Sequence, residues 1–308
     1  MARPGNRWHD RAIAVPTLCF QDGTGVTRIT APALPRSYIP QMNSLNKQFH
    51  SRWLHGPSVA CETFPPGAHL PWRIVLLGAP GVGKGTQADL LNQRLDACHL
   101  STGDVFRAAA GRSDADQSPA MKEALGYMRR GELVPDSTVW DLVRERSECL
   151  HCAGGFILDG FPRTLAQAVA LKQLMDHEGL GLTAVVNYEL PEADIVARLG
   201  GRRTCEKCKT VYHVTERPPK VAERCDRCAG KLFQRDDDRP ESIKVRLEAY
   251  KRNAAPLIEF YAKARLLMQV PATGTPDEIC DRTLPELESR RIRQFAHLMW
   301  SYEENRRD

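Results

Sequence analysis

The chain has 308 residues, of which 42% are hydrophobic and 26% are charged, and its formal net charge is +5. This length supports one large domain or two, and the composition is typical of a folded globular protein. No stretch approaches the roughly 20 apolar residues that span a bilayer, so the sequence excludes a transmembrane helix. The mild positive charge permits a polyanionic partner without requiring one. The ten cysteines of this long chain, with no visible signal peptide, favour a reducing compartment over a secreted disulfide framework.

Residues 1–71 differ from the rest of the chain. They contain nine of the 21 prolines and only three acidic residues, and no helical or strand periodicity persists in them. We therefore expect a mostly disordered N-terminal extension. A transit peptide is an alternative, because such peptides are rich in arginine and poor in acidic residues. A misassigned start codon would also produce such a leader, with Met42 as an internal candidate.

An alternation of strands and helices begins at Trp72. The short apolar run 74–77 ends in glycine, which is typical of a buried parallel strand. Further strands are expected at 98–101, 156–158, 184–190 and 267–270, and helices at 119–130, 137–149, 165–178, 192–199 and 241–267. This alternation predicts an α/β fold in which helices cover both faces of a parallel sheet.

The sequence GAPGVGKGT at 78–86 stands between the first expected strand and a helix. It fits the phosphate-loop pattern GxxxxGK[ST], in which glycines turn backbone N–H groups toward phosphate oxygens at a helix N-terminus. Lys84 then brings a positive charge to the β- and γ-phosphates. Gly85 takes the usual Ser/Thr position, so Thr86 offers the nearest hydroxyl for Mg²⁺. The loop predicts nucleotide binding but does not identify the reaction.

Two CxxC pairs interrupt the alternation within 204–238, a segment with little apolar content. Sixteen residues separate the pairs, and this spacing is typical of a structural Zn²⁺ site. The candidate ligands are Cys205, Cys208, Cys225 and Cys228, which would fill a tetrahedral site and leave no open position. Disulfides are the alternative use of these thiols. A third CxxC, formed by Cys149 and Cys152, is interpreted as ordinary, partly buried thiols.

Three further motifs follow the phosphate loop in order: LSTGDVFR at 100–107, GELVPD at 131–136 and GFILDGFPRT at 155–164, with Gln167 beyond. With these motifs the chain resembles the adenylate kinases, within the nucleoside monophosphate kinase family, over roughly residues 73–288. The resemblance implies a three-layer P-loop NTPase core with a five-stranded parallel sheet, an inserted helical AMP-binding segment and a zinc-stapled lid. The implied boundaries are 72–100, 135–200 and 239–288 for the core, 101–134 for the AMP-binding insertion, 201–238 for the lid and 289–308 for a charged tail.

The resemblance also implies a reaction, the reversible Mg²⁺-dependent transfer of a phosphoryl group from ATP to AMP to give two ADP. The implied catalytic residues are Lys84, Asp159, Arg163, Arg202, Arg235 and Arg246. The implied ATP-binding residues are Gly81, Val82, Gly83, Lys84, Gly85, Thr86, Arg198, Val211, Tyr212 and Gly274. The implied AMP-binding residues are Thr102, Arg107, Glu132, Leu133, Val134, Gly160, Phe161, Pro162, Arg163, Gln167, Arg235 and Arg246. Mg²⁺ is implied near Thr86 and, through its waters, near Asp159.

Two positions depart from the family pattern. Val82 is bulkier than the small residue common in that loop, and we expect the backbone cradle to survive it. Pro271-Ala272 replaces an Asp-Gly pair after the last strand, which puts the contact between Gly274 and the ATP base in doubt.

Other functions stay open at this point. One is a kinase for UMP, CMP or GMP, or one that uses GTP as donor, although Thr102 and Gln167 favour adenine as the acceptor base. The other is a zinc-ribbon ATPase that binds nucleic acid. Such a site favours interleaved aromatic residues and a basic stripe. The insertion holds only Tyr212 and Phe233, beside the acidic run 236–238.

We expect ATP, AMP and ADP as partners, with no nucleic acid and no membrane, and a monomeric chain. The expected location is the cytoplasm, or an organelle matrix if residues 1–71 are a transit peptide.

Overall fold

The structure is a computed structural model that describes residues 18–22, 25–29, 53–54, 71–110, 119–152 and 154–304, and the side chains of 53–54, 71–109, 121–152 and 154–294. Residues 1–46 and 47–308 form two compact units, and each is described by itself. Among the described residues, none of the helices combines the length and the apolar character that crossing a membrane requires.

The first unit contains a hairpin. Strand β1 (Leu18–Asp22) pairs antiparallel with β2 (Gly25–Ile29), in a register that sets Asp22 opposite Gly25. At these ten residues the structure differs from the expected disordered extension. The signal lies in the turn chemistry, because a glycine at the first of two positions between strand-forming runs, here Gly23, is a hairpin signature that periodicity alone misses.

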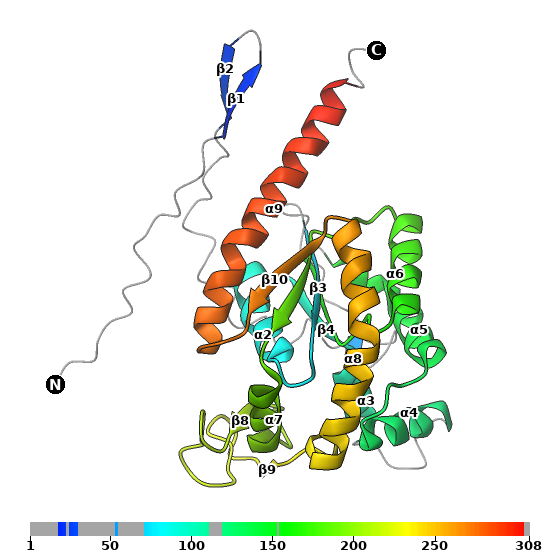
Figure 1. Cartoon of the computed structure of the whole chain (residues 1–308), viewed down its shortest axis with the longest axis vertical. Coiled ribbons are helices and arrows are strands. Elements are labelled where there is room, and N and C mark those ends of the chain that lie inside the picture. The colour runs from blue at the N-terminus through cyan, green and yellow to red at the C-terminus, as the bar shows by residue number, and fades with distance from the viewer. Residues whose placement is uncertain are drawn as a thin grey trace, which may run out of the picture. The chain divides into compact units, whose positions relative to one another are not determined.

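The second unit is built on a parallel sheet of five strands in the order β10-β6-β3-β5-β4 (Figure 1). All its neighbouring strands pair in parallel. The strands are β3 (Trp72–Gly78), β4 (Cys98–Ser101), β5 (Gly155–Asp159), β6 (Ala184–Glu189) and β10 (Leu267–Pro271). The predicted α/β fold with a five-stranded parallel sheet is confirmed.

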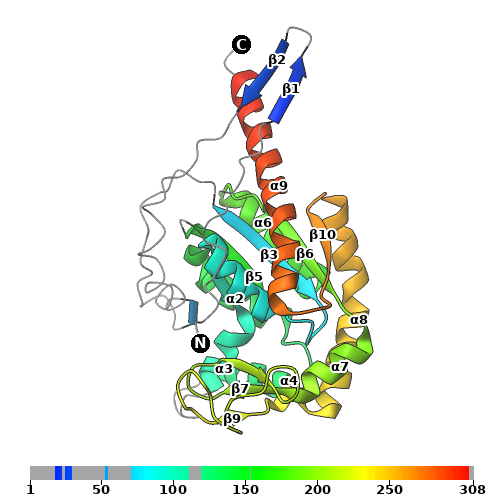
Figure 2. The same cartoon turned by 90° about the vertical axis from the view of Figure 1, so that its left-hand side faces the viewer.

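Strand β3 reads as a continuous apolar run because both faces of the sheet are covered. Ile74 and Leu76 join the cluster formed with α2 and α9, whereas Val75 and Leu77 join the cluster formed with α5, α6 and α8. Figures 1 and 2 show these two helical layers on either side of the sheet. The helices are α2 (Lys84–Leu95), α5 (Asp136–Glu145), α6 (Leu165–His177), α8 (Pro240–Lys263) and α9 (Pro276–Glu304).

Two insertions extend from this core at the carboxyl end of the strands. The first follows β4 and contains α3 (Thr102–Ala110) and α4 (Pro119–Arg130). The second follows α7 (Glu192–Gly201) and is a three-stranded antiparallel sheet, β8-β7-β9, with its own small core of Cys205, Tyr212, Cys225 and Leu232. Its elements are β7 (Arg202–Cys205), β8 (Val211–His213), β9 (Leu232–Phe233) and the 3₁₀ turn η5 (Asp236–Asp238). We call this second insertion the lid.

Two expected helices end earlier than the sequence suggested. The helix expected to reach residue 267 ends at Lys263, because Arg265 takes a left-handed conformation with φ of 57° and β10 begins at Leu267. The helix expected to reach residue 149 ends at Glu145, and the 3₁₀ turn η4 (Ser147–His151) follows it. In both cases the apolar periodicity of the sequence continues past the last residue of the helix, so periodicity does not indicate where the helix ends.

Helix α9 continues into the expected charged tail as far as Glu304, the last described residue. Arg290 donates to the carbonyl oxygen of Leu267 at 2.7 Å, and the Arg291 guanidinium lies 4.1 Å from the centre of the Trp72 ring. Trp72 opens β3, the strand that leads to the phosphate loop. The arginines at the start of the tail therefore fasten α9 to the two strands β10 and β3.

We expect Arg291→Ala to lower the free energy of unfolding by about 0.5–2 kcal/mol, because it removes a cation–π contact and the cover over Trp72. Arg293→Ala is the matched control, since the Arg293 side chain is 63% exposed, and its effect should stay within about 0.5 kcal/mol. Urea unfolding of both variants measures the difference. Equal stability of the two variants would contradict a structural role for Arg291.

Candidate active site

The phosphate loop connects β3 to α2. Gly81 and Gly83 have φ of +84° and +106°, a region that disfavours any residue with a Cβ, and Gly83 is the N-cap of α2. The loop thereby turns backbone N–H groups inward at a helix N-terminus, which is the arrangement that binds phosphate. The side chain of Val82 is 1% exposed and packs in the core cluster of β3 and α2, so its bulk lies outside the cradle.

Lys84 occupies the centre of this loop. Its Nζ donates to the carbonyl oxygens of Gly78 at 2.7 Å and Ala79 at 3.0 Å. Desolvation lowers the pKa of Lys84, whereas the negative charge of Asp159 raises it. The positive charges of three arginines lower it further, and the resulting pKa is about 8. The three are Arg163, Arg246 and Arg202. They come from three different segments, so the fold gathers cations around the loop.

Asp159 ends β5, next to β3, and faces the start of α2. A Cβ on Gly85 would lie 3.5 Å from its Oδ2. Desolvation would raise the pKa of Asp159, but a hydrogen bond and the charge of His99 bring it below the usual value.

His99 is a residue that the sequence analysis missed. Its Nε2 lies 3.6 Å from Asp159 Oδ2 and its Nδ1 lies 3.0 Å from Asp89 Oδ1. Burial disfavours the charged imidazole, but the two carboxylates outweigh burial and raise the pKa of His99 to about 10. A protonated His99 thus links α2 to the end of β5 and holds the Asp159 carboxylate. The available signal was a histidine placed two residues before the end of a predicted strand.

Thr102 and Arg107 lie on α3, beside the end of β5. Thr102 Oγ1 is 3.5 Å from the carbonyl oxygen of Asp159, and a Cβ on Gly160 would lie 2.9 Å from that hydroxyl. Arg107 Nε donates to Asp104 Oδ1 at 3.1 Å. Burial would raise the pKa of Asp104, but the charges of Arg107 and His99 hold it well below its usual range. The structure thus brings the STGD and GFPR motifs into contact.

Gln167 lies on α6 and is 4% exposed. Its Oε1 accepts from the backbone N–H of Arg163 at 2.7 Å, and its Nε2 donates to Asp136 Oδ1 at 2.7 Å. The other oxygen of Asp136 accepts from Thr164 Oγ1 at 2.8 Å. The carboxamide is therefore oriented by the protein, and the bond to Asp136 uses one of the two Nε2 protons. Asp136, at the start of α5, is a positioning residue that the sequence analysis did not single out.

Several residues expected at the AMP site point their side chains into the core. Val134 is 9% exposed, and Phe161 is fully buried and stacks on Trp140 with ring centres 6.3 Å apart. Pro162 is also buried. The Glu132 carboxylate forms an ion pair with the Arg130 guanidinium at 2.7 Å, and the Leu133 side chain is half-buried. Residues with buried side chains leave only their backbone for a ligand.

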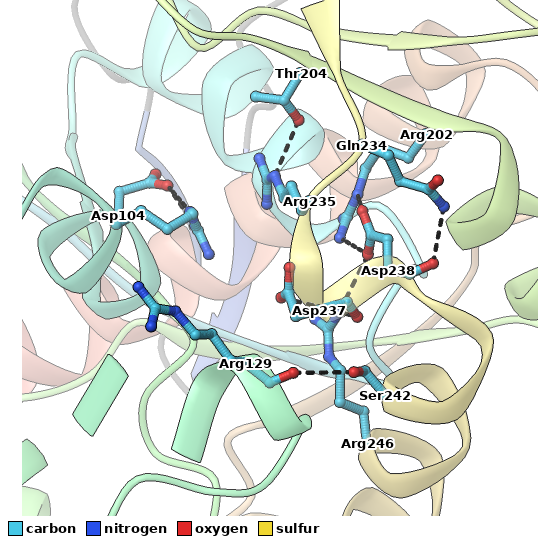
Figure 3. A network of polar contacts seen from close by, with 11 residues as sticks. Asp104, Arg129, Arg202, Thr204, Gln234, Arg235, Asp237, Asp238, Ser242 and Arg246 are labelled. Atoms are coloured by element: carbon cyan, nitrogen blue, oxygen red, sulfur yellow. Dashed lines mark hydrogen bonds and ion pairs between the residues drawn. The ribbon is translucent and has the colours of Figure 1, made fainter. Parts of the chain in front are cut away.

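Figure 3 shows the arginines of the lid and the carboxylates that hold them. Arg202 donates to both carboxylate oxygens of Asp238, from Nε to Oδ2 at 2.6 Å and from Nη2 to Oδ1. Asp238 is fully buried. Arg246 on α8 reaches Asp238 Oδ1 at 3.3 Å and Asp237 Oδ2 at 3.0 Å. These two carboxylates fix both guanidinium groups at the base of the lid.

Arg235 lies on the same side as the acceptor elements. Its Nε donates to Thr204 Oγ1 at 2.9 Å (Figure 3). Desolvation lowers its pKa, and the charges of Arg107 and Arg202 lower it further, while Asp104 opposes them. Arg235 therefore lies near the Asp104–Arg107 pair of α3, which places a residue of the lid against the first insertion.

Arg198 and Gly274 lie on the opposite side of the phosphate loop. Arg198 donates to the carbonyl oxygens of Val82 at 3.4 Å and Ala272 at 3.1 Å, so it joins the loop to the segment after β10. Gly274 has φ of +93°, and a Cβ there would lie 2.5 Å from Glu278 Oε2. Hydrogen bonds between residues 275 and 278 in both directions form a capping box at the start of α9.

Val211 and Tyr212 lie on β8. Val211 is half-buried, and Tyr212 is 5% exposed, with its hydroxyl accepting from the backbone N–H of Asp226 at 2.9 Å. The Tyr212 side chain thus belongs to the core of the lid.

The four cysteines of the two CxxC pairs come together in the lid. Their Sγ atoms all lie within 4.8 Å of one another, and this is the one such group of three or more His, Cys, Asp or Glu found among the described residues. The Sγ atoms of Cys205 and Cys228, and those of Cys208 and Cys225, are 3.4 Å apart. A disulfide requires about 2.05 Å, whereas tetrahedral thiolates around Zn²⁺ stand further apart. The donor set is compatible with a zinc ion.

The third CxxC pair lies away from these residues. Cys149 is buried in the core cluster beside α5, and Cys152 is half-buried just after η4.

Residues 76–266 match the sequence family described as adenylate kinase. An adenylate kinase of Thermodesulfovibrio yellowstonii is 47% identical over 218 residues, 71% of this chain and 100% of that protein. Those of Geotalea uraniireducens and Streptomyces coelicolor are 46% and 45% identical over 69% and 70% of this chain, and 96% and 98% of their own lengths. The chain belongs to the adenylate kinase family. As a member of this family it is a nucleotide-binding phosphotransferase that acts on ATP and AMP.

Asp238 is the buried carboxylate on which the two arginines converge. We expect Asp238→Ala to lower the free energy of unfolding by about 3–5 kcal/mol, because it leaves Arg202 and Arg246 close together with their shared counter-ion removed.

The matched control is Asp236→Ala, in the same acidic run. The Asp236 side chain is 57% exposed and its ion pair is with the exposed Arg239, so its loss should cost no more than about 1 kcal/mol. Urea unfolding of both variants measures the contrast, and similar losses would show that burial does not govern the Asp238 interaction.

Proposed function

We propose that the space between the phosphate loop, α3, the GFPR turn and the lid holds ATP and AMP with their phosphates meeting at Lys84. We base this on cations from separate segments that lie close enough to alter one another's pKa values. These cations are Lys84, Arg107, Arg163, Arg202, Arg235 and Arg246. They outnumber the carboxylates among them, namely Asp104, Asp159, Asp237 and Asp238, which suits a polyanionic ligand pair.

The chemistry is the transfer of the γ-phosphoryl group of ATP to a phosphate oxygen of AMP. This acceptor oxygen is already ionised, so the protein needs no strong general base. The transferring group spreads negative charge over its oxygens, and catalysis consists of positioning and electrostatic stabilisation. Lys84, Arg163, Arg202, Arg235 and Arg246 supply the positive charges. Closure of the lid over the nucleotides excludes water, which would otherwise accept the phosphoryl group.

Asp159 and Thr86 are the residues that would hold Mg²⁺, with Asp159 acting through water. The fit rests on the depressed pKa of Asp159, which keeps it a carboxylate, and on its place beside the start of α2. Bound Mg²⁺ would neutralise phosphate charge and align the β- and γ-phosphates. His99 keeps the carboxylate oriented toward that position.

On the donor side, the backbone of Gly81, Val82, Gly83 and Gly85 would cradle the ATP phosphates. Arg198 would lie against the ATP base, because it bridges the phosphate loop and the segment that leads to Gly274. Val211 and Tyr212 would contribute backbone contacts from the lid.

On the acceptor side, Arg107 and Arg163 would bind the AMP phosphate. Thr102 and the remaining Nε2 proton of Gln167 would contact adenine, with the carboxamide held by Asp136. The backbone of Glu132, Leu133, Val134, Gly160, Phe161 and Pro162 would line the ribose and base.

The four lid cysteines would hold a structural Zn²⁺ ion. Four thiolates leave no open position for substrate, so the ion stabilises the lid and takes no part in the transfer. A lid of some forty residues with a core of four side chains needs such a staple.

The alternative acceptors and donors are tested with a coupled assay of nucleoside diphosphate formation. ATP and GTP are each combined with AMP, GMP, CMP and UMP. We expect ATP with AMP to give the highest kcat/KM. A higher value with another monophosphate would reassign the acceptor site, and a salt-dependent shift of DNA or RNA at physiological salt would favour the nucleic-acid alternative.

The cytoplasmic location and the monomeric state expected from the sequence stay predictions, as does the transit peptide.

Lys84→Ala should lower kcat/KM by at least about 10²-fold, the loss typical of one group that stabilises transition-state charge. Lys172→Ala is the matched control, because Lys172 is 60% exposed on α6 and its ion pair is with Asp176 on the same helix. The coupled assay measures both, and circular dichroism checks that both variants are folded. Activity of Lys84→Ala near that of the control would refute the assignment.

Zinc content and melting temperature test the lid site. The purified chain should contain about one zinc per chain, and Cys205→Ala or a chelator should remove the metal and lower Tm. The turnover measured at low temperature should change much less than Tm. Cys152→Ala is the control, and its zinc content should equal that of the wild type. A metal-free wild-type chain with unchanged Tm would contradict the proposal.

A further inference from the structure

Trp53 lies well before the family match, which begins at residue 76, yet it is part of the core. Its side chain is 1% exposed and belongs to the cluster that α3, α5, α6 and α8 form on one face of the sheet. Leu54 packs against the same cluster. A tryptophan this completely buried contributes a large apolar contact, so residues outside the family's shared domain complete the core here.

Two hydrogen bonds connect Trp53 to elements on either side of it. Its indole Nε1–H donates to the carbonyl oxygen of Ser101 at 3.0 Å, and its own carbonyl oxygen accepts from Arg146 Nη1 at 2.5 Å. Ser101 ends β4, and Arg146 is the C-cap of α5. Trp53 therefore joins two elements that are 45 positions apart in the sequence.

Both elements lead directly to the acceptor side of the site. Ser101 is the residue before α3, and its Oγ accepts from the backbone N–H of Asp104 at 3.2 Å, which fixes the first turn of that helix. The same turn carries Thr102, and Arg107 follows one turn later. At its other end α5 begins with Asp136, which orients Gln167.

We propose that Trp53 is a positioning residue for the acceptor nucleotide, which it influences by fixing the junction of β4 and α3. This rests on the acceptor site proposed above. The indole N–H holds the Ser101 carbonyl from outside the helix, so the first turn of α3 keeps the orientation that presents Thr102 and Arg107. The phosphate loop and Arg198, which serve the donor side, lie on segments other than those that Trp53 contacts through hydrogen bonds.

The same contact has a consequence for the N-terminal segment. If a leader is removed, the cut must fall before Trp53. A cut between 54 and 71 would take the tryptophan out of the core and remove the carbonyl oxygen that accepts from Arg146, whose side chain is 9% exposed. We therefore expect the native protein to retain Trp53.

Trp53→Phe in the full chain tests the positioning role, because it keeps most of the apolar volume and removes the N–H donor. We expect KM for AMP to rise roughly two- to tenfold, the equivalent of one lost hydrogen bond, while KM for ATP and kcat change less than about twofold. Tyr261→Phe is the matched control, since it removes the hydroxyl of another buried aromatic residue of the same cluster. Both KM values should stay at the wild-type level in that variant.

An equal rise of KM for AMP and ATP, or no rise at all, would overturn the positioning role while leaving the reaction intact. Loss of AMP phosphorylation already in the wild-type chain would instead overturn the proposed function. Amide hydrogen exchange provides a second readout: protection in the first turn of α3 should fall in Trp53→Phe and not in Tyr261→Phe. N-terminal sequencing of the native protein tests retention, and a first residue between 54 and 71 would contradict it.

Discussion

The active site depends on a scaffold that holds several positively charged side chains close together against their mutual repulsion. Arg163, Arg202 and Arg246 lie close enough to Lys84 to lower its pKa, so each destabilises the charge of the others. The fold opposes this repulsion with carboxylates, and the fully buried Asp238, the last residue of η5, binds two of the guanidinium groups. The carboxylates are fewer than the cations. The remaining positive charge favours a ligand that carries many negative charges, and the phosphates of two nucleotides meet this requirement.

The sheet provides the scaffold, because three neighbouring parallel strands end at one edge. The pairing of β4 with β5 sets Ser101 beside Asp159, and the pairing of β3 with β5 brings Leu76, two residues before the phosphate loop, to the same level. A slip of one residue in either pair would exchange the two faces of a strand, and the close packing of each face against its own helical layer opposes such a slip. The register of the core therefore sets the distance between the acceptor motif and the phosphate loop.

Local sequence patterns were sufficient for the parts of the site that depend on local conformation. The glycines of the phosphate loop and the acid at the end of β5 lie where their motifs predicted. The directions of Gln167, Phe161 and Tyr212 were not predictable, because each is set by a partner far along the chain or by the core. Gln167 pairs with a residue 31 positions away, and the indole of Trp53 with one 48 positions away. Such long-range contacts produce no periodic pattern in the sequence. The end of α8 was also not predictable, because the left-handed position that follows it is occupied by Arg265 and not by a glycine.

The lid shows how a metal ion held by the four cysteines would act on distant residues through short connections. Cys205 ends β7, and Arg202 begins the same strand, so any constraint on the cysteine is passed on within four residues. The neighbouring pair in the sheet is Thr204 with Phe233, and the Thr204 hydroxyl accepts from Arg235 just beyond β9. Arg202 and Arg235 are thus fixed to adjacent strands of one small sheet. A zinc ion that locks this sheet would also fix the spacing of its two arginines, and the lid could move over the nucleotides as one body without losing that spacing.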